Sequence, residues 1–197
     1  MYHKFTKRIQ IYYAPVLFRF FMEVYQLKHA DNPGRPILKL PVALVLDNLS
    51  DNLNVGSMFR LADALGVEKM WHCGETPYPP HKVINRTSRG AHHHVEFEHV
   101  ETTLQCLEQL RAKGYTIVLL EITNTSKDLR TVDFKAMGKV ALVLGREFTG
   151  MTDEALQYGD MAVHIPMLGR VHSLNVATSA AIALYELVRQ FEVFREV

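Results

Sequence analysis

Three polar clusters in this 197-residue chain carry the residue types that could do chemistry. They are Asn52 to Arg60, Arg146 to Gly150, and Ser173 to Asn175. Together they offer amides, hydroxyl groups, a carboxylate and guanidinium groups, which orient a substrate and stabilise charge that develops during a reaction. The chain has neither a GxGxxG pattern nor a P-loop lysine motif, so the usual dinucleotide and nucleoside triphosphate interpretations lack support.

The second and third clusters are positioned by buried strands and a helix. Val140–Leu144 is an apolar run that ends at Gly145, as expected for a strand buried on both faces of a parallel sheet. Met161–Ile165 predicts a second strand, which stops at Pro166. A long helix with apolar residues at helical spacing begins at Ser173–Asn175. We expect these two strand ends and the helix start to converge, because open α/β sheets bind ligands there.

The first cluster follows another buried strand, Val42–Leu46, and opens a helix that ends at Gly66. Asn52 or Asn54 is expected to cap this helix. Its buried stripe is predicted to hold Val55, Met58, Phe59, Ala62 and Leu65, with Gly56, Arg60 and Asp63 on the opposite face. Arg60 should therefore point away from the core, and from spacing alone it is a solvated arginine paired with Asp63.

The other elements alternate between strand and helix. Glu68–His72 and Tyr115–Glu121 are predicted strands, and Thr102–Lys113 is a predicted helix that ends at Gly114. Thr152 is expected to cap another short helix. Ile122–Gly138 is expected to be a loop with a short helical piece. This alternation predicts an α/β fold with a mostly parallel sheet and helices on both faces.

The charge pattern limits how the chain could bind nucleic acid. The net charge is +1, so any RNA-binding surface has to be a local patch. The stretch His81–Ala91 is locally basic and has hydroxyl groups, which are the residue types that contact phosphates and sugars. The alternative is an ordinary exposed loop.

Metal and disulfide chemistry are not predicted. The histidines 92 to 94 are consecutive, and consecutive strand residues alternate faces, so the three side chains cannot converge on one ion. The two cysteines, Cys73 and Cys106, do not make a disulfide framework or a metal site. We expect both to be buried thiols in a reducing compartment, the cytoplasm.

Residues 1–36 form a predicted N-terminal extension with an amphipathic helix that starts near Pro15. Arg19 and Glu23 interrupt its apolar stretch, and no small-residue cleavage site follows. It is therefore predicted to be neither a membrane span nor a signal peptide. Residues 37–197 form the predicted main domain.

The three clusters also carry a family resemblance. The segments NLNVGSMFRLADALGV at 52–67, GREFTGM at 145–151 and IPMLGRVHSLNVATSAAIALYE at 165–186 resemble the three motifs of the SpoU (TrmH-type) branch of the SPOUT RNA methyltransferases. The resemblance covers roughly residues 41 to 187, and the three motifs stand in the family's order.

The resemblance implies a fold, a reaction and a cofactor. It implies a deep C-terminal trefoil knot that binds S-adenosylmethionine, a homodimer whose active site is completed by the second subunit, and methyl transfer to a ribose 2′-hydroxyl of tRNA or rRNA. The positions that match the cofactor pocket are Leu120, Glu121, Leu144, Gly145, Ile165, Met167, Ser173 and Leu174. A SPOUT-type base methyltransferase and a catalytically inactive RNA-binding protein are the alternatives.

The resemblance also assigns residues to catalysis and to RNA. The matching catalytic positions are Asn54, Arg60, Glu147, Ser173 and Asn175, and the expected RNA contacts are Lys82, Arg86, Ser88 and Arg89. Arg146 departs from the family, whose second motif more often has a small or amide residue there, and we expect it to add a contact to RNA phosphate. Because a guanidinium hardly deprotonates in proteins, we expect Arg60 to act by charge, with Glu147 holding it in place. The sequence names neither the RNA nor the nucleotide.

Overall fold

The computed structural model of the protein describes residues 38–147 and 149–191. The predicted amphipathic helix of the N-terminal extension lies outside these residues. Within them the chain alternates between strands and helices, and the elements follow one another closely along the sequence.

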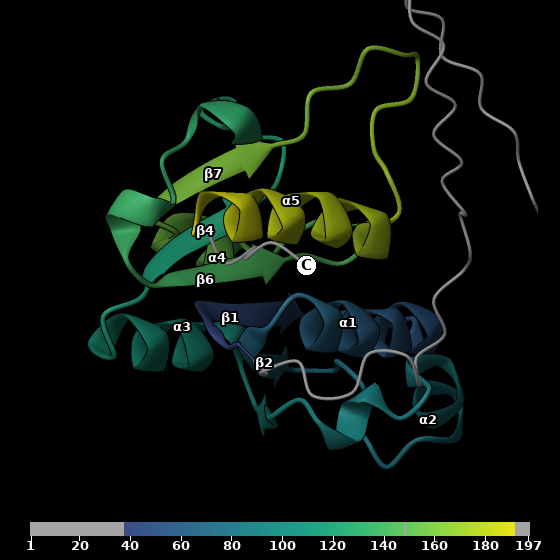
Figure 1. The fold of residues 1–197 in the computed structure, drawn as a ribbon. Helices are drawn as coiled ribbons and strands as arrows, with labels where there is room; N and C mark the ends of the chain where they lie inside the picture. The colour runs from purple at the N-terminus through teal and green to yellow at the C-terminus, as the bar shows by residue number, and fades with distance from the viewer. Residues whose placement is uncertain (1–37, 148, 192–197) are drawn as a thin grey trace, which may run out of the picture. The chain divides into compact units, whose positions relative to one another are not determined.

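Seven strands form one sheet in the described part of the chain, in the order β3-β2-β1-β6-β4-β7-β5 (Figure 1). Every neighbouring pair is parallel, which confirms the predicted parallel sheet. The bounds of the strands are Leu40–Asp47 for β1, Val67–Cys73 for β2, Phe97–Val100 for β3, Thr116–Leu120 for β4, Lys127–Asp128 for β5, Val140–Leu144 for β6 and Met161–His164 for β7.

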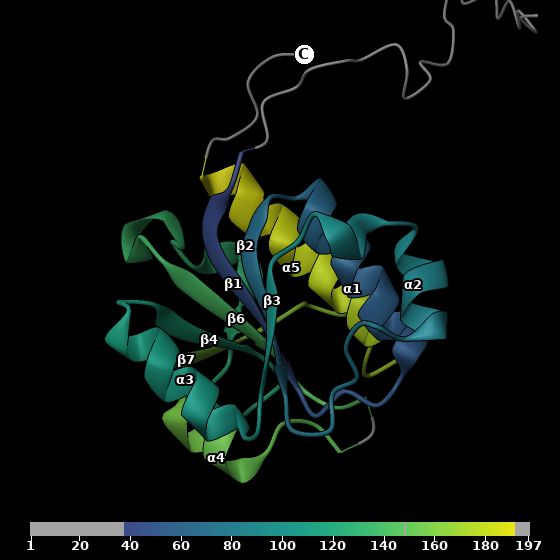
Figure 2. The same ribbon diagram turned by 90° about the horizontal axis from the view of Figure 1, so that it is seen from below.

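Helices cover both faces of this sheet, as the sequence predicted. Helices α1 and α5 lie side by side on one face, and α3 and α4 lie together on the other (Figures 1 and 2). Helix α2 packs against α1. The helices are α1 Asn52–Ala64, α2 Lys82–Ser88, α3 Thr103–Ala112, α4 Asp153–Tyr158 and α5 Val176–Gln190, with 3-10 turns at Ala91–His93, Leu129–Thr131 and Lys135–Met137.

The core has two halves, one on each face of the sheet, and β1 contributes to both. Its side chains alternate in direction, as in any strand. Leu44 packs in the half that holds Phe59 of α1 and Leu184 of α5. Val45, the next residue, packs in the half that holds Leu107 of α3. A strand covered on both sides has to be apolar throughout, which explains the continuous runs seen in the sequence.

The helix caps agree with the prediction at α4 and differ from it at α1. Thr152 caps α4 as expected, and Thr102 and Asn175 cap α3 and α5, each through its side-chain oxygen. Helix α1 is capped by Asp51, whose side chain accepts a hydrogen bond from the amide of Leu53, so the prediction of an asparagine cap was wrong.

The segment between β2 and β3 differs most from the prediction. Residues 82 to 88 form helix α2 rather than an exposed loop. Gly56 is buried against this helix, and a Cβ atom there would lie 2.6 Å from Cβ of Thr87. Gly56 therefore allows α1 and α2 to approach closely. The prediction that it lies on the face opposite the core was wrong. The histidines 92 and 93 lie in a 3-10 turn, not in a strand. Strands β3 and β5 were not predicted.

Two further expectations concern the cysteines and the membrane. Cys73 and Cys106 are buried free thiols, as predicted. A hydrogen bond with Cys73, together with burial, raises the pKa of the Cys106 thiol, which keeps it protonated and unreactive. No helix in residues 38–147 and 149–191 is long and apolar enough to cross a bilayer.

Candidate active site

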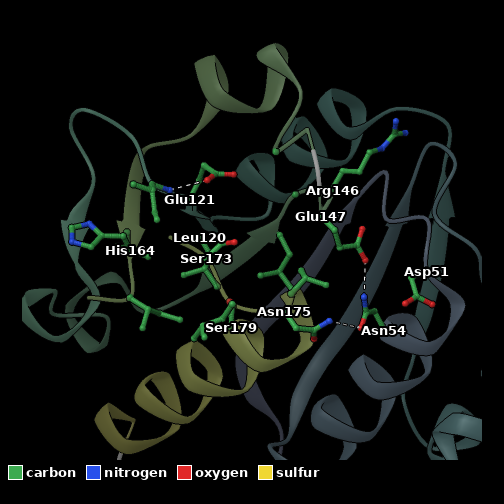
Figure 3. A pocket seen from close by; sticks show the side chains of 18 of the residues that line it. Asp51, Asn54, Leu120, Glu121, Arg146, Glu147, His164, Ser173, Asn175 and Ser179 are labelled. Atoms are coloured by element: carbon green, nitrogen blue, oxygen red, sulfur yellow. Dashed lines mark hydrogen bonds between the residues drawn. The ribbon is translucent and has the colours of Figure 1, made fainter. Parts of the chain in front are cut away.

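A pocket of about 620 Å³ lies at the carboxyl ends of the central strands (Figure 3). Its walls are the loop after β1, the ends of β4, β6 and β7, and the start of α5. This is the edge at which a parallel sheet binds its ligands. The structure brings all eight of the expected cofactor positions to this pocket: Leu120, Glu121, Leu144, Gly145, Ile165, Met167, Ser173 and Leu174.

A chain of side-chain hydrogen bonds joins the three sequence motifs beside the pocket. The Nδ2 atom of Asn175 donates to Oδ1 of Asn54 at 3.1 Å, and Nδ2 of Asn54 donates to Oε1 of Glu147 at 2.7 Å (Figure 3). The Oδ1 atom of Asn175 accepts from the amides of Ala177 and Thr178 at the start of α5. Each asparagine thus both donates and accepts a hydrogen bond, so the donor and acceptor of every bond in the series are fixed.

Glu147 ends this chain with one carboxylate oxygen bound and one free. Its Oε2 atom is buried and has no hydrogen-bond partner in the described part of the protein. Asn54, its partner, is only 8% exposed. A buried carboxylate oxygen without a donor is costly for the fold, and groups of this kind are found at functional sites. Glu147, which lines the pocket, therefore keeps an unused acceptor that is shielded from solvent.

Arg60 is the one predicted catalytic residue that the structure leaves out of the pocket. Its side chain is exposed, and it has no ion pair or hydrogen bond with any residue that the structure describes. The expected contact between Arg60 and Glu147 is absent from the structure, in which Glu147 binds Asn54 instead. The alternative pairing with Asp63 is wrong as well, since Asp63 lies 3.7 Å from Nδ1 of His94.

The second motif is held in place by a buried aspartate and a tight turn. Asp47, at the end of β1, accepts from the amide and the hydroxyl group of Thr152 at 2.8 and 3.2 Å and from the hydroxyl group of Thr103. The backbone of Arg146 pairs with that of Gly150 in both directions, which closes the loop on itself. A Cβ atom on Gly145 would lie 2.7 Å from the amide nitrogen of Met151, so the turn requires glycine there.

Arg146 lines the pocket, but its guanidinium group points away from the Asn54–Glu147 pair (Figure 3). Its Nε atom donates to the carbonyl of Asn48 at 2.9 Å, and Nη2 donates to Oε2 of Glu75 at 3.0 Å. The residue expected to contact RNA thus links the second motif to the loops that follow β1 and β2.

The other expected RNA contacts lie on and after α2, outside the pocket. Lys82, Arg86 and Arg89 are exposed and have no ion pair among the described residues. Ser88 is buried, and its hydroxyl group bonds the carbonyl of Asn85 and Nδ1 of His92, so it does not face solvent. The described residues hold no group of three histidine, cysteine, aspartate or glutamate side chains that could bind a metal ion.

The pocket also contains polar residues that the sequence interpretation missed. They are Ser50, Asp51, His164 and Ser179. Ser179 lies one helical turn after Asn175, and this spacing alone places both residues on one side of α5. His164 bonds the hydroxyl group of Ser126 at 3.0 Å, and only the fold brings these two residues together.

Comparison with known proteins agrees with this geometry. The model of the SpoU rRNA Methylase family matches residues 41–185, which include the first two motifs and all but the last residue of the third. The chain belongs to the SpoU methylase family. A relative of this family named tRNA (guanosine(18)-2′-O)-methyltransferase, from Thermus thermophilus, is 32% identical over 149 residues that cover 76% of this chain and 75% of the relative.

Other SpoU relatives are longer than this chain. The 23S rRNA (guanosine-2′-O-)-methyltransferase RlmB of Ralstonia nicotianae is 33% identical over 76% of this chain, but the match covers 59% of that protein. The chain therefore spans less than two thirds of the length of several curated relatives that it matches.

Solved structures of SpoU proteins share the fold. The A. aeolicus TrmH/SpoU tRNA modifying enzyme superimposes with a TM-score of 0.71 at 29% identity, over 79% of this chain and 78% of that one. An AdoMet-bound rRNA methyltransferase from Sinorhizobium meliloti gives a TM-score of 0.72 at 29% identity, over 78% of this chain and 57% of that one.

Proposed function

We propose that this protein transfers a methyl group from S-adenosylmethionine to a ribose 2′-hydroxyl of tRNA or rRNA. The observation that carries the proposal is the hydrogen-bond chain Asn175–Asn54–Glu147, because it joins the three family motifs beside one pocket. Relatives whose names give 2′-O-methylation of tRNA or 23S rRNA, and a related structure with AdoMet bound, support the reaction and the cofactor.

The residues of the pocket fit S-adenosylmethionine. A volume of about 620 Å³ lies within the range of roughly 300–1,000 Å³ that is usual for small-molecule sites. Leu120, Leu144 and Leu174 would bury the flat adenine ring, and the carboxylate of Glu121 would accept hydrogen bonds from ribose hydroxyl groups. The cofactor supplies a methyl group that is activated by a positively charged sulfur atom.

The chain's own residues then have to hold the 2′-hydroxyl and remove its proton. The buried Oε2 atom of Glu147 is free to accept that proton, and Asn54 keeps the carboxylate in position through Oε1. Asn175 fixes Asn54 in turn, and Ser173 lies beside it as a further donor for the ribose or its phosphate. Alignment of the reacting atoms, more than any single group, accelerates such a displacement.

We also propose a homodimer and a knotted C-terminal segment. The position of Arg60 supports the dimer, because it is exposed and outside its own pocket, where it is available to a site that a second copy completes. In that site its charge would hold the phosphate next to the target ribose. Membership of the SpoU family supports the trefoil knot, with β6 between β1 and β4 and α5 returning to pack on α1.

Two experiments test the proposal. Calorimetry should detect binding of S-adenosylmethionine and S-adenosylhomocysteine, but not of NAD or ATP. Incubation with bulk tRNA and rRNA and radiolabelled S-adenosylmethionine, followed by digestion and chromatography, should place the label in 2′-O-methylated nucleosides. Label in methylated bases would favour the base methyltransferase, whereas RNA binding without methyl transfer would indicate an inactive binding protein.

A further inference from the structure

The loop between β2 and α2 presents an exposed aromatic ring on a rigid support. Tyr78 is 44% exposed, although it is an aromatic residue in a short, well-anchored loop. Its ring lies against that of His99, with the ring centroids 4.6 Å apart and the planes 33° apart. The Nε2 atom of His99 bonds the carbonyl of Gly74 at 2.9 Å, so the stacked pair is fixed from beneath.

Each of the three residues before Tyr78 is tied to a different part of the fold. Glu75 forms an ion pair with Arg146, which lines the pocket. Thr76 is buried, and its hydroxyl group bonds both the carbonyl of Leu46 and the amide of Leu49. The carbonyl of Pro77 accepts a hydrogen bond from the ring of buried His72 at 2.8 Å. Tyr78 therefore stays in place without help from a ligand, which lowers the entropic cost of binding one.

The loop that carries Tyr78 is also joined to a residue that lines the pocket. The Arg146–Glu75 contact joins the second motif to the loop, and Tyr78 follows Glu75 by three residues, or at most about 10 Å of chain. That distance is a few nucleotides of an RNA strand, at a rise of about 3.4 Å each. The exposed cations Lys82 and Arg86 follow Tyr78 in the sequence, on α2, and would offer positive charge to the polymer backbone.

We propose that Tyr78 stacks on an unpaired base of the same RNA whose target ribose is in the pocket; this inference rests on the proposed function. Every base has a π-face, and aromatic side chains bind unpaired RNA by stacking on it. A base that stacks on Tyr78 is not stacked within an RNA double helix, so the preferred substrate is an RNA loop or a single strand. The platform selects for unpaired structure around the target and not for one base.

The test compares Tyr78→Ala, Tyr78→Leu, Tyr78→Phe and Tyr78→Trp with Leu156→Ala, an exposed apolar residue on α4 as a control. The probe is a short single-stranded RNA that contains 2-aminopurine, whose fluorescence falls when the base stacks. We expect the Ala and Leu variants to bind this RNA about 10-fold more weakly and to lose the quenching, while Phe and Trp keep both. Binding of S-adenosylmethionine and the melting temperature should stay at the values of the unchanged protein.

Three results would overturn the inference. They are unchanged RNA binding by Tyr78→Ala, equal weakening by Tyr78→Phe, and tighter binding of a fully paired RNA than of the single strand. Absence of RNA binding by the unchanged protein would overturn it too. Absence of methyl transfer alone would instead remove the proposed function, because the fluorescence measurement does not need catalysis.

Discussion

Asn54 and Glu147, 93 residues apart in the sequence, meet in a 2.7 Å hydrogen bond at the wall of the pocket. Asn54 lies on α1 and Glu147 in the loop after β6, so the bond joins two neighbouring strand ends. Because Asn54 is also held by Asn175, the free carboxylate oxygen of Glu147 has a fixed direction.

The first prediction concerns this pair. Glu147→Gln removes the proton acceptor, and Asn54→Ala removes the group that positions it, so each should lower kcat by about 10²–10³-fold. The double variant should be little worse than either single one, because residues that act as a unit are not additive. Single-turnover kinetics at saturating S-adenosylmethionine would measure this. Fully additive losses would contradict the link between the two residues.

The second prediction concerns Arg60 and the dimer. Arg60→Ala should lower kcat by about 10²–10³-fold without weakening cofactor binding, whereas Arg60→Lys should keep part of the activity because a cation remains. When Arg60→Ala and Glu147→Gln subunits are mixed and allowed to exchange, a mixed dimer regains one complete site. A statistical mixture should then recover roughly a quarter of the original activity.

The complementation has a clear control. Mixing Arg60→Ala with Arg60→Ala/Glu147→Gln should restore nothing, since no pocket then receives both groups. Light scattering should show a mass of twice the 22.5 kDa chain for every variant. A fully active monomer, or no recovery in freely exchanging mixtures, would mean that Arg60 does not act across subunits.

The third prediction concerns the contact of α1 with α2. Gly56→Ala would bring a Cβ atom within 2.6 Å of Cβ of Thr87 and within 3.2 Å of the Ile84 carbonyl, so the helices have to separate. We expect a loss of about 1–3 kcal/mol in the free energy of unfolding, the usual cost of overpacking. Ser57→Ala, the next position on the helix, is the control and should change little. Thermal unfolding would show this, and adding Thr87→Gly should recover part of the loss.

The fourth prediction concerns pH and His72. Burial lowers the pKa of His72 from 6.5 to about 4 in the folded protein. Between these values the unfolded chain binds a proton at this residue and the folded chain does not, so the free energy of unfolding falls as the pH falls. At pH 4 this effect of His72 lowers the free energy of unfolding by about 3 kcal/mol compared with neutral pH.

A matched variant isolates this effect. His72→Phe keeps a ring between Phe59 and Phe97, but it cannot titrate and loses the bond to Pro77. Urea unfolding at several pH values should show that the protein with His72 loses more free energy of unfolding between pH 7 and pH 4.5 than the His72→Phe variant does. A difference that does not change with pH would refute the assignment.

The sequence predicted the elements that have a strong local pattern. The apolar run of β6 gave the same bounds, Val140–Leu144, as the structure. The short polar helix α2 buries only Ile84 and Ser88, so it has no apolar stripe to recognise. Strand β3 lies at the edge of the sheet and is largely exposed, and β5 has only two residues. Elements that form mainly because of the elements around them, such as α2, β3 and β5, leave little recognisable pattern in the sequence.

The candidate site shows the same limit. Residues that line the pocket were predicted because three motifs mark them, but the predicted contact between Arg60 and Glu147 is absent from the structure. Six residues separate Asn54 from Arg60, which turns the helix by about 240° beyond a full turn. The two side chains therefore point about 120° apart around α1, and the helical spacing alone separates Arg60 from the side that faces the pocket.

The order of strands in the sheet has a consequence for how the protein reaches its fold. Central strand β1 pairs with β2 on one side, but its other partner is β6, with Val42 opposite Val140. During synthesis β1, β2 and β3 can associate early, whereas the backbone groups along one edge of β1 stay unpaired until β6 has left the ribosome. Such non-local pairing slows folding and exposes a strand edge to other chains. Chains interrupted before residue 140 should therefore aggregate, and a chaperone that covers this edge should raise the yield of folded protein.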